Sequence, residues 1–357
     1  MLNHVRVIDL TQSLGAFAGR MLAELGAEVI KIEPPSGDPQ RQHPTTFAAW
    51  NHGKRSVVTT TDSEQFKRLV SGADIVLRNP GLDHNQMAAW NTQLIDVVIS
   101  GFLGHESTDN RQYTDFTLMA RSGLMTIIGD PDRPPLTLPG EQAYALGAIQ
   151  AVTGALTALY ARHNNQRGQL VEVSAYQAAV LANYREPLTW AWTGRVGNRT
   201  GNLLVRGKSG VRQVWPCLDG FVTWALVDNP PMMRSMVTVM GDQAGELTQI
   251  DWNSILVADV ERETLKRWED IVAAFFLKHT KTELGELSAQ HGLGLSWIDQ
   301  PNDVMASKQC EARQLWVDVN QYRLPGPLWV SDVSMTGQRR QVPELGEGNS
   351  ELLGDAS

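Results

Sequence analysis

Apolar and polar residues near the start of the chain follow a pattern typical of strands and helices that succeed one another. Residues 5–11 ("VRVIDLT") and 27–34 ("AEVIKIEP") are short apolar runs rich in β-branched residues. Between them, residues 16–26 ("AFAGRMLAELG") place apolar side chains at helical spacing and end in glycine, which favours a helix C-cap. A strand, a helix and a strand in so short a stretch form a βαβ unit, which predicts a parallel sheet.

Three further apolar runs extend this pattern, at residues 54–60, 73–79 and 96–102. The helix-like segment "SEQFKRLVSG" separates the first two, so this part of the chain predicts a doubly wound α/β domain. The turn after the first strand reads "TQSLGAFAG" and lacks the G-x-G-x-x-G fingerprint of dinucleotide sites. This argues against a nicotinamide or flavin enzyme, but it leaves the crevice at the carboxyl ends of the strands available for another ligand.

Later in the chain the pattern changes twice. Helical spacing dominates from about residue 113 to about residue 195, interrupted by the short strand in "NQRGQLVEVS". Strand-like stretches return at residues 212–224 and 316–330, with a less regular helical region between them. These changes predict a large domain, a smaller domain and a C-terminal segment that returns to the large domain, at residues 1–205, 212–300 and 301–357.

The composition narrows the possible partners. The 357 residues are 42% hydrophobic and 20% charged, which is typical of a soluble globular protein. The formal net charge of −8 argues against nucleic acid as a partner. Two cysteines are too few for a disulfide framework and suit a reducing compartment. The eight histidines show no spacing suited to a metal site, so no bound metal is expected.

Targeting signals are also not expected. The chain starts "MLNHVRVIDLT", without a basic and then apolar signal segment. The longest weakly polar run, "LGAIQAVTGALTALY", is interrupted by Gln150, Thr153 and Thr157 and is interpreted as too short to span a bilayer. We therefore expect a cytoplasmic protein without a membrane partner.

The order of several motifs along the chain resembles that of the class III CoA-transferases. These motifs are "LGAEVIKIEPPSGD" followed by "GKRS", then "ADIVLRNPG", "SGLMTIIGDPDRPP", "RGQLVEVS", "CLDGFV" and "RLPGPLWV". The family includes carnitine and formyl-CoA transferases and α-methylacyl-CoA racemases. The resemblance implies a Rossmann-like large domain built from both chain ends, a smaller α+β domain, and two ring-shaped subunits interlocked in a dimer. It also implies an acyl-CoA and a carboxylic acid as substrates, with coenzyme A as the group carried between them.

For coenzyme A, the resemblance implies a groove that binds phosphates through cations and through the N–H groups of a helix start. The candidate residues are Leu14, Gly15, Ala16, Arg41, Lys54, Arg55, Asn79 and Asp115, with Gly207, Lys208, Ser209 and Gly210 in a loop that closes over the thioester in some members. Arg78 is a further candidate for a phosphate contact. Alternatives remain for most of them: surface charges for the cations, a simple turn for Asn79, a helix N-cap for Asp115 and an interdomain linker for residues 205–211.

The position of the catalytic residue raises the main question. Transferases of this family attack the thioester with an aspartate that lies four residues after a proline and four before a glycine. Here Pro139 and Gly147 frame that position, and Ala143 occupies it. Glu141 is the nearest carboxylate and could act in its place, although a cap on the following helix is the alternative role.

Three functional interpretations follow. The leading one is CoA transfer between an acyl-CoA and a carboxylic acid, with Glu141 as the nucleophile or with activity supplied by a partner subunit. The second is a catalytically silent subunit that pairs with an active paralogue in a mixed dimer. The third is an acyl-CoA lyase or isomerase that forms no covalent intermediate. A racemase is disfavoured because its aspartate also falls on Ala143 and "RQYTDF" lacks its histidine.

Overall fold

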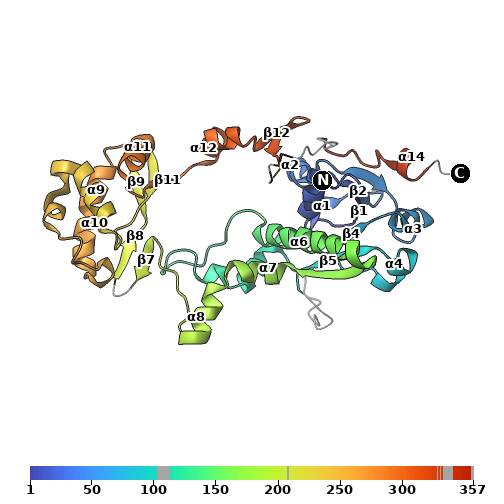
Figure 1. The fold of residues 1–357 in the computed structure, drawn as a ribbon, viewed down its shortest axis with the longest axis horizontal. Coiled ribbons are helices and arrows are strands. Elements are labelled where there is room, and N and C mark those ends of the chain that lie inside the picture. Colours follow the sequence, from blue (N-terminus) through green and yellow to red (C-terminus); the bar gives the residue numbers. More distant parts are fainter. Residues whose placement is uncertain (103–112, 207–208, 328, 330, 333–340, 355–357) are drawn as a thin grey trace. The chain divides into compact units, whose positions relative to one another are not determined.

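The computed structural model describes residues 1–102, 113–206, 209–327, 329, 331–332 and 341–354. The chain forms two compact units. The first comprises residues 1–126, 137–197 and 307–357, and the second comprises residues 127–136 and 198–306. Figure 1 labels the elements of both along the chain.

A six-stranded parallel sheet forms the centre of the first unit (Figure 1). Its strands are β1 (Arg6–Asp9), β2 (Glu28–Glu33), β3 (Arg55–Val58), β4 (Ile75–Arg78), β5 (Ile95–Ser100) and β6 (Gln169–Ser174). They lie in the order β3-β2-β1-β4-β5-β6, and every neighbouring pair is parallel. The predicted α/β class with a parallel sheet is confirmed. In this order the chain changes direction across the sheet between β1 and β4, and open α/β sheets generally bind ligands at such a point, beyond the carboxyl ends of the strands.

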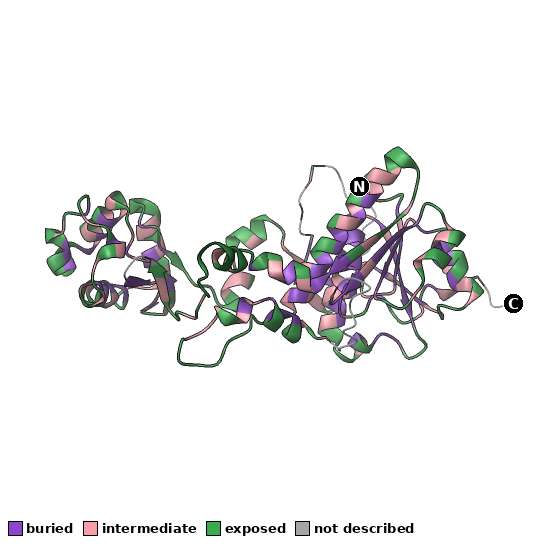
Figure 2. Ribbon diagram, turned by 90° about the horizontal axis from the view of Figure 1, so that it is seen from below, coloured by how far each residue is buried: buried purple, intermediate pink, exposed green. Residues whose placement is uncertain are grey.

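Helices cover both faces of this sheet. The helices of this unit before its C-terminal segment are α1 (Ala16–Glu24), α2 (Pro44–Asn51), α3 (Glu64–Ser71), α4 (His84–Trp90), α5 (Asp115–Arg121), α6 (Gln142–Asn165), α7 (Ala175–Ala182) and α8 (Arg185–Thr193), with short 3₁₀ turns η1 (Pro39–Gln42) and η2 (Leu124–Thr126). Of these, α8 extends away from the sheet and has no buried residue (Figure 1). Phe66 of α3 and Met87 of α4 pack in one core cluster with Ile8 and Ile30 of the sheet. The helices α1 and α6 pack against each other, and α6 packs on β5 and β6. Figure 2 shows the central strands as buried.

A buried ion pair lies beneath α1. Lys54 and Asp9 are both fully buried, and the Lys54 ammonium donates to the Asp9 carboxylate at 2.7 Å. Its other two donors reach the carbonyl of Ala16 at 2.7 Å and the side-chain oxygen of Asn51 at 2.8 Å. A Cβ on Gly19 would lie 2.3 Å from the Asp9 carboxylate, so glycine at this position makes room for the pair. The pair therefore ties β1, α1 and the end of α2 together.

The helix α6 corrects one sequence-based expectation. It spans 24 residues, and among the described residues it is the one helix long and apolar enough to cross a bilayer. The interpretation that this run is too short to span a membrane is therefore wrong on length, because the interrupting polar residues do not end the helix. Its apolar side instead packs on α1, α7 and the sheet. A Cβ on Gly147 would lie 3.1 Å from Ala175, which shows how closely α6 and α7 approach.

Gly168 marks a close contact between neighbouring strands. A Cβ there would lie 2.1 Å from the carbonyl oxygen of Leu94, which precedes β5. Because the obstacle is backbone, it cannot rotate away, and we expect Gly168→Ala to lower the free energy of unfolding by about 1–3 kcal/mol. Urea unfolding followed by circular dichroism measures this loss. Gly72→Ala is the control, since a Cβ there meets nothing closer than 3.7 Å. Equal unfolding midpoints for the two variants would contradict the strand contact.

The second unit has its own core. Its strands are β7 (Leu203–Arg206), β8 (Ser209–Arg212), β9 (Val214–Cys217), β10 (Gly220–Thr223) and β11 (Ser296–Trp297). Its helices are α9 (Pro230–Met240), α10 (Arg262–Phe276), α11 (Lys281–His291) and α12 (Pro301–Met305), with 3₁₀ turns η3 (Gly241–Gln249) and η4 (Val257–Asp259). Trp215, Trp224 and Phe276 meet at ring-centroid distances of 5.6 to 6.0 Å in its centre. The β9, β10 and β11 strands form an antiparallel sheet over this core.

The observed limits of the second unit differ from the predicted ones. Residues 198–205 belong to it because β7 pairs antiparallel with β8, and β8 packs on α10. Residues 127–136 and 301–306 also belong to it. The helical pattern before residue 195 did not indicate that the chain enters the second unit at residue 127 and returns to the first at residue 137.

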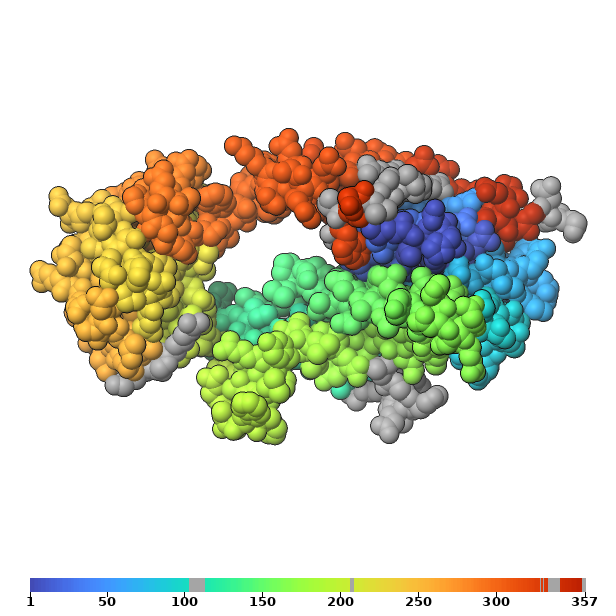
Figure 3. All heavy atoms as spheres, viewed as in Figure 1, coloured from blue at the N-terminus to red at the C-terminus, as the bar shows by residue number. Residues whose placement is uncertain are grey.

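The C-terminal segment packs on the first unit. It contains α13 (Lys308–Ala312), β12 (Trp316–Val319), β13 (Tyr322–Pro325) and α14 (Asn349–Leu352). The Asn349 side chain accepts a hydrogen bond from the N–H of Val58 at 2.9 Å, and the N–H of Gly348 donates to the carbonyl of Ser56 at 2.9 Å. In Figure 3 the red residues of α14 lie against the blue N-terminal part of the chain. The segment thus covers the outer strand, β3.

Candidate functional site

The first part of the site is the loop that joins β1 to α1. Gly15 has a φ of 102°, in the left-handed region, and a Cβ there would lie 2.8 Å from Ile99 and from Thr11. The Asn79 amide donates to the carbonyls of Leu14 at 3.0 Å and Ile99 at 2.9 Å. Asn79 therefore holds this loop against the end of β5, which is a more specific role than the simple turn considered as the alternative. Leu14, Gly15 and Ala16 are themselves buried.

A cavity of 290 Å³ lies at the carboxyl ends of β1, β2 and β3. Its lining combines the carboxylates of Glu33 and Asp38 with the hydroxyls of several threonines, and it contains no lysine or arginine. Asp38 is paired with buried Lys31 at 2.6 Å, so its charge is neutralised inside the protein. This cavity lies where open α/β sheets bind their ligands.

The predicted phosphate-binding cations are all engaged inside the first unit. Lys54 is fully buried and uses all three ammonium donors, so the prediction that it contacts a phosphate, and the alternative of a surface charge, are both wrong. Its partner Asp9 lies far away in the sequence, which explains why the motif gave no sign of burial. Arg78 is also buried, where it forms two 2.8 Å hydrogen bonds to buried Asp96, so it is not available to a phosphate.

Arg41 and Arg55 remain partly exposed. Arg41 forms two 2.7 Å hydrogen bonds to Glu33 and donates to the carbonyl of Pro343 at 3.1 Å. Arg55 pairs with Glu351 of α14 at 2.5 Å and with Glu28 at 3.3 Å. A phosphate would have to displace one of these carboxylates, and a role of either arginine in CoA binding stays a prediction.

The second part of the site is the start of α6. Glu141 is the N-cap residue of α6 and Ala143, fully buried, lies in its first turn. The Asp115 carboxylate, at the start of α5, accepts a hydrogen bond from the third amide of α6, that of Tyr144, at 3.0 Å. Thr114 caps α5, so the helix whose N-terminus the Asp115 side chain contacts is α6 and not its own. Trp50 of α2 lies close enough to Glu141 to influence the pKa of its carboxyl group.

The pKa values at this point are shifted upward. Burial raises the pKa of Glu141, and the negative charge of Asp115 raises it further, while Trp50 lowers it in part. Burial also raises the pKa of Asp115, against the effect of the α6 amides. The pKa of Tyr144 rises to about 12, through burial first and then through the nearby acidic groups. Two half-buried carboxyl groups therefore lie next to each other, with a helix amide bound to one of them.

Part of the predicted loop over the thioester falls outside the described residues, namely Gly207 and Lys208. Ser209 and Gly210 are buried in β8, where Gly210 pairs with Val205 and Ser209 with Arg206 of β7. Residues 205–206 and 209–211 lie in these two strands of the second unit, which argues against the alternative of an interdomain linker for them.

Sequence reasoning missed Trp50, Tyr113 and Tyr144. Tyr144 lies three residues after Glu141 at the start of α6, and this spacing was the available signal. Trp50 of α2 and Tyr113, just before α5, approach Glu141 and Tyr144 only through the tertiary fold. Among the described residues, no group of three His, Cys, Asp or Glu side chains is placed to hold a metal ion.

The chain matches the model of CoA-transferase family III over residues 2–349, and it belongs to this family. The family acts on CoA thioesters, which defines the class of protein.

Two curated relatives and one solved structure show how close the similarity is. The chain is 24% identical to the succinyl-CoA:(R)-benzylsuccinate CoA-transferase subunit BbsE of Thauera aromatica, over 98% of this chain and 92% of that protein. It is 27% identical to the succinyl-CoA–D-citramalate CoA-transferase of Chloroflexus aurantiacus, over 99% of this chain and 93% of that protein. The fold matches a CAIB/BAIF family protein from Brucella suis with a TM-score of 0.85 and 25% identity, over 97% and 96% of the two chains.

Proposed function

We propose that this chain transfers coenzyme A from an acyl-CoA to a carboxylic acid, with the Glu141 carboxylate as the nucleophile. The observation that carries the proposal is the placement of Glu141. It is half-buried at the start of a long helix and makes no capping hydrogen bond there, while Asp115 accepts the hydrogen bond of the third helix amide, that of Tyr144. A raised pKa makes an ionised carboxylate a stronger nucleophile than an exposed one.

The proposed reaction balances as two exchanges. The Glu141 carboxylate attacks the thioester carbonyl, the C–S bond breaks, and CoA thiolate leaves a mixed anhydride. The thiolate then attacks the glutamyl carbonyl of the anhydride, which releases the first acid and leaves a glutamyl-CoA thioester. The acceptor carboxylate repeats these steps in reverse, so that a new acyl-CoA forms and Glu141 is regenerated. In this scheme Glu141 replaces the family aspartate, whose position we assign to Ala143.

Coenzyme A is proposed to bind across the first unit at the carboxyl ends of the strands. The loop at Gly15 and its anchor Asn79 would shape the groove, with Arg41 and Arg55 at its margin. A role of Ser209 and Gly210 in covering a bound thioester stays a prediction of the family resemblance. A cytoplasmic location stays a prediction from the sequence.

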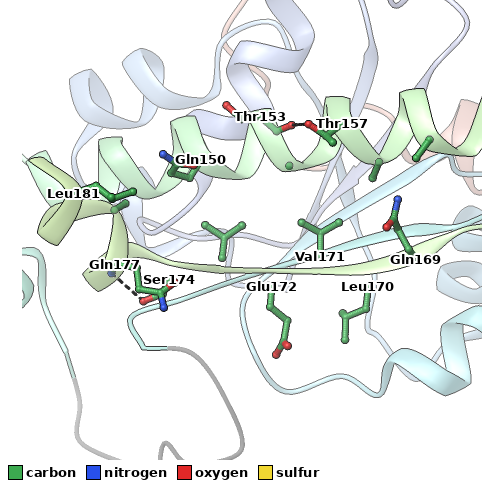
Figure 4. Close-up of a pocket in the computed structure, with 15 residues that line it drawn as sticks. Gln150, Thr153, Thr157, Gln169, Leu170, Val171, Glu172, Ser174, Gln177 and Leu181 are labelled. Carbon is green, nitrogen blue, oxygen red and sulfur yellow. Dashed lines mark hydrogen bonds between the residues drawn. The ribbon is translucent and has the colours of Figure 1, made fainter. Parts of the chain in front are cut away.

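An interlocked dimer is proposed for the assembly. Apolar side chains of α8 and of the segment before it are more than half exposed in the single chain: Leu181, Tyr184, Leu188, Trp190 and Trp192. A groove of 520 Å³ lies between α6 and the outer strand β6, with Gln150, Thr153 and Thr157 on its helix side (Figure 4). Exposed apolar area of this kind usually marks an interface, and it supports burial against a second subunit.

A silent subunit in a mixed dimer is the second candidate. One specific observation favours it, because the similar protein from Thauera aromatica is named as a subunit of its CoA-transferase. In such a dimer the active partner would carry an aspartate at the position that Ala143 occupies here.

A transfer assay tests the proposal. The purified chain receives succinyl-CoA, the donor that both relatives are named for, with (R)-benzylsuccinate, D-citramalate and further dicarboxylic acids as acceptors. New acyl-CoA esters, detected by liquid chromatography and mass spectrometry, are the expected result. CoA binding without transfer, followed by transfer once a family paralogue is added, would establish the silent subunit instead. No binding and no transfer under either condition would overturn both.

The pH dependence of transfer follows from the raised pKa of Glu141. The nucleophile must be ionised, so kcat/KM should fall as the pH drops through a midpoint above 4.5, the ordinary value for glutamate. Stability responds with the opposite sign: because the folded pKa is raised, the contribution of Glu141 to folding is full below the unfolded pKa and is lost as the pH rises through the folded one. This acid-side fall of kcat/KM is measured by a pH–rate profile, with circular dichroism at each pH to confirm that the protein is folded. A rate that stays constant below pH 4.5 in folded protein would contradict an ionised Glu141 as the attacking group.

A further inference from the structure

The start of α6 is capped by a residue from another helix. Glu141 holds the N-cap position, yet within the described part of the chain its side chain makes no capping hydrogen bond. The Asp115 carboxylate fills this role from α5. The amide that it binds is that of Tyr144, the third residue of α6, at 3.0 Å. Asp115 thus accepts a hydrogen bond from the first turn of α6 that the side chain of the N-cap residue normally accepts.

We infer that Asp115 is a positioning residue of the transfer site: it caps α6 from outside and so leaves the Glu141 carboxylate free to react. The inference rests on the proposed function for the reaction of Glu141. A carboxylate that accepts several amide hydrogen bonds is stabilised as an anion, and this makes it a poorer nucleophile. If Glu141 capped its own helix, its oxygens would be bound in this way. Asp115 makes that contact instead, so one carboxyl group caps α6 and the other, that of Glu141, attacks the thioester.

Trp50 of α2 also acts on Glu141. Its indole lowers the pKa of the Glu141 carboxyl group in part, against the effects of burial and of the Asp115 charge. The Trp50 ring packs edge-on against Phe17 of α1 at a centroid distance of 4.7 Å, so α1 fixes the position of this indole.

The charge of Asp115 also acts on Glu141 directly. The titratable groups that face this cluster are Asp115 from α5, Tyr144 from α6 and Tyr113 from the segment before α5, while α2 contributes the uncharged Trp50. The tyrosines are neutral near pH 7, since the pKa values of both are raised by burial. Loss of the Asp115 charge should therefore move the titration of Glu141 to lower pH.

Two substitutions separate the charge from the cap. Asp115→Asn removes the charge but keeps a side-chain oxygen for the α6 amides, and Asp115→Ala removes both. The matched controls are Asp83→Asn and Asp83→Ala, because Asp83 caps α4 in the same unit through the N–H of Asn85 at 3.0 Å. All variants are made in the full chain.

The readouts do not depend on turnover alone. Carbodiimide labelling of Glu141, followed by mass spectrometry across a pH range, reports where this carboxyl loses its proton. Asp115→Asn should shift that midpoint to lower pH, together with the acid limb of transfer from succinyl-CoA. Asp115→Ala should also make hydrogen exchange at the first amides of α6 roughly fivefold faster. Neither Asp83 variant should move the Glu141 midpoint.

The outcomes distinguish this inference from the proposed function. If transfer occurs and requires Glu141, but Asp115→Asn leaves both the labelling midpoint and the acid limb unchanged, Asp115 has no positioning role and the inference is overturned. Unchanged exchange at the α6 amides in Asp115→Ala would overturn the external cap in the same way. If the chain shows no transfer but the midpoint shifts as expected, the contact between the carboxyl groups stands and the proposed function fails.

Discussion

Glu141→Gln is expected to reduce the rate of CoA transfer by roughly 10⁴-fold, as the loss of a catalytic nucleophile does in other covalent enzymes. The amide has the size of the carboxylate and can still meet Trp50, but it cannot form an anhydride. Because the change is confined to a half-buried side chain, the fold and the binding of succinyl-CoA should persist. Steady-state kinetics with the same donor and acceptor measure the loss, and calorimetry with succinyl-CoA measures the retained binding.

The controls for this variant use other carboxylates. Glu286→Gln changes an exposed side chain of α11 in the second unit and should leave the transfer rate unchanged. Glu141→Asp keeps the charge but shortens the side chain by one methylene, so a partial loss is expected because misplacement of an attacking atom is costly. Full activity of Glu141→Gln would show that another group performs the attack.

Lys54→Met is expected to lower the free energy of unfolding by about 3–5 kcal/mol, which is the usual cost of removing one partner from a buried ion pair. The substitution leaves Asp9 fully buried without its cation and removes hydrogen bonds to Ala16 and Asn51. The pH response should change as well. In the native chain burial raises the pKa of Asp9, but the charges of Lys54 and Lys31 and the hydrogen bonds from Lys54 and Thr11 together lower it below its usual value. Its contribution to stability is therefore present above the unfolded pKa and is lost as the pH falls.

In the variant we expect this pH response to weaken. Without Lys54, burial is opposed only by Lys31 and Thr11, so the pKa of the Asp9 carboxyl should rise, and the loss of stability should be smaller in mild acid than at neutral pH. Urea unfolding at several pH values measures both effects. Lys266→Met removes an exposed pair with Asp270 and should leave the unfolding midpoint unchanged. If Lys54→Met is as stable as Lys266→Met, the buried pair does not hold β1 to α2 as described.

The strands and the sheet class could be predicted because the signal is local. Short β-branched runs mark β1 to β5 directly, and the helix between β1 and β2 makes the sheet parallel. The limits of the second unit could not be predicted in this way, because residues 198–205 join it through the pairing of β7 with β8 and not through their own hydrophobic pattern. A boundary set by tertiary pairing leaves little trace in hydrophobic periodicity.

The candidate site was predictable to a smaller extent. The sequence identified Glu141 and Asp115 as separate residues, but their interaction depends on the contact between α5 and α6. For Lys54 the sequence was misleading. A lysine beside an arginine ahead of a strand is usually a surface charge, and its burial depends on Asp9, far away in the chain, and on the absence of a side chain at Gly19. Such pairings become visible only in three dimensions.

The most direct test is to trap the covalent state that the account requires. The chain is incubated with succinyl-CoA, reduced with borohydride and digested, and the peptide that carries Glu141 is sequenced by mass spectrometry. We expect a reduced side chain, the corresponding alcohol, at Glu141 and at no other acidic residue, and none in Glu141→Gln. An unmodified Glu141 in protein that demonstrably transfers coenzyme A would contradict the account.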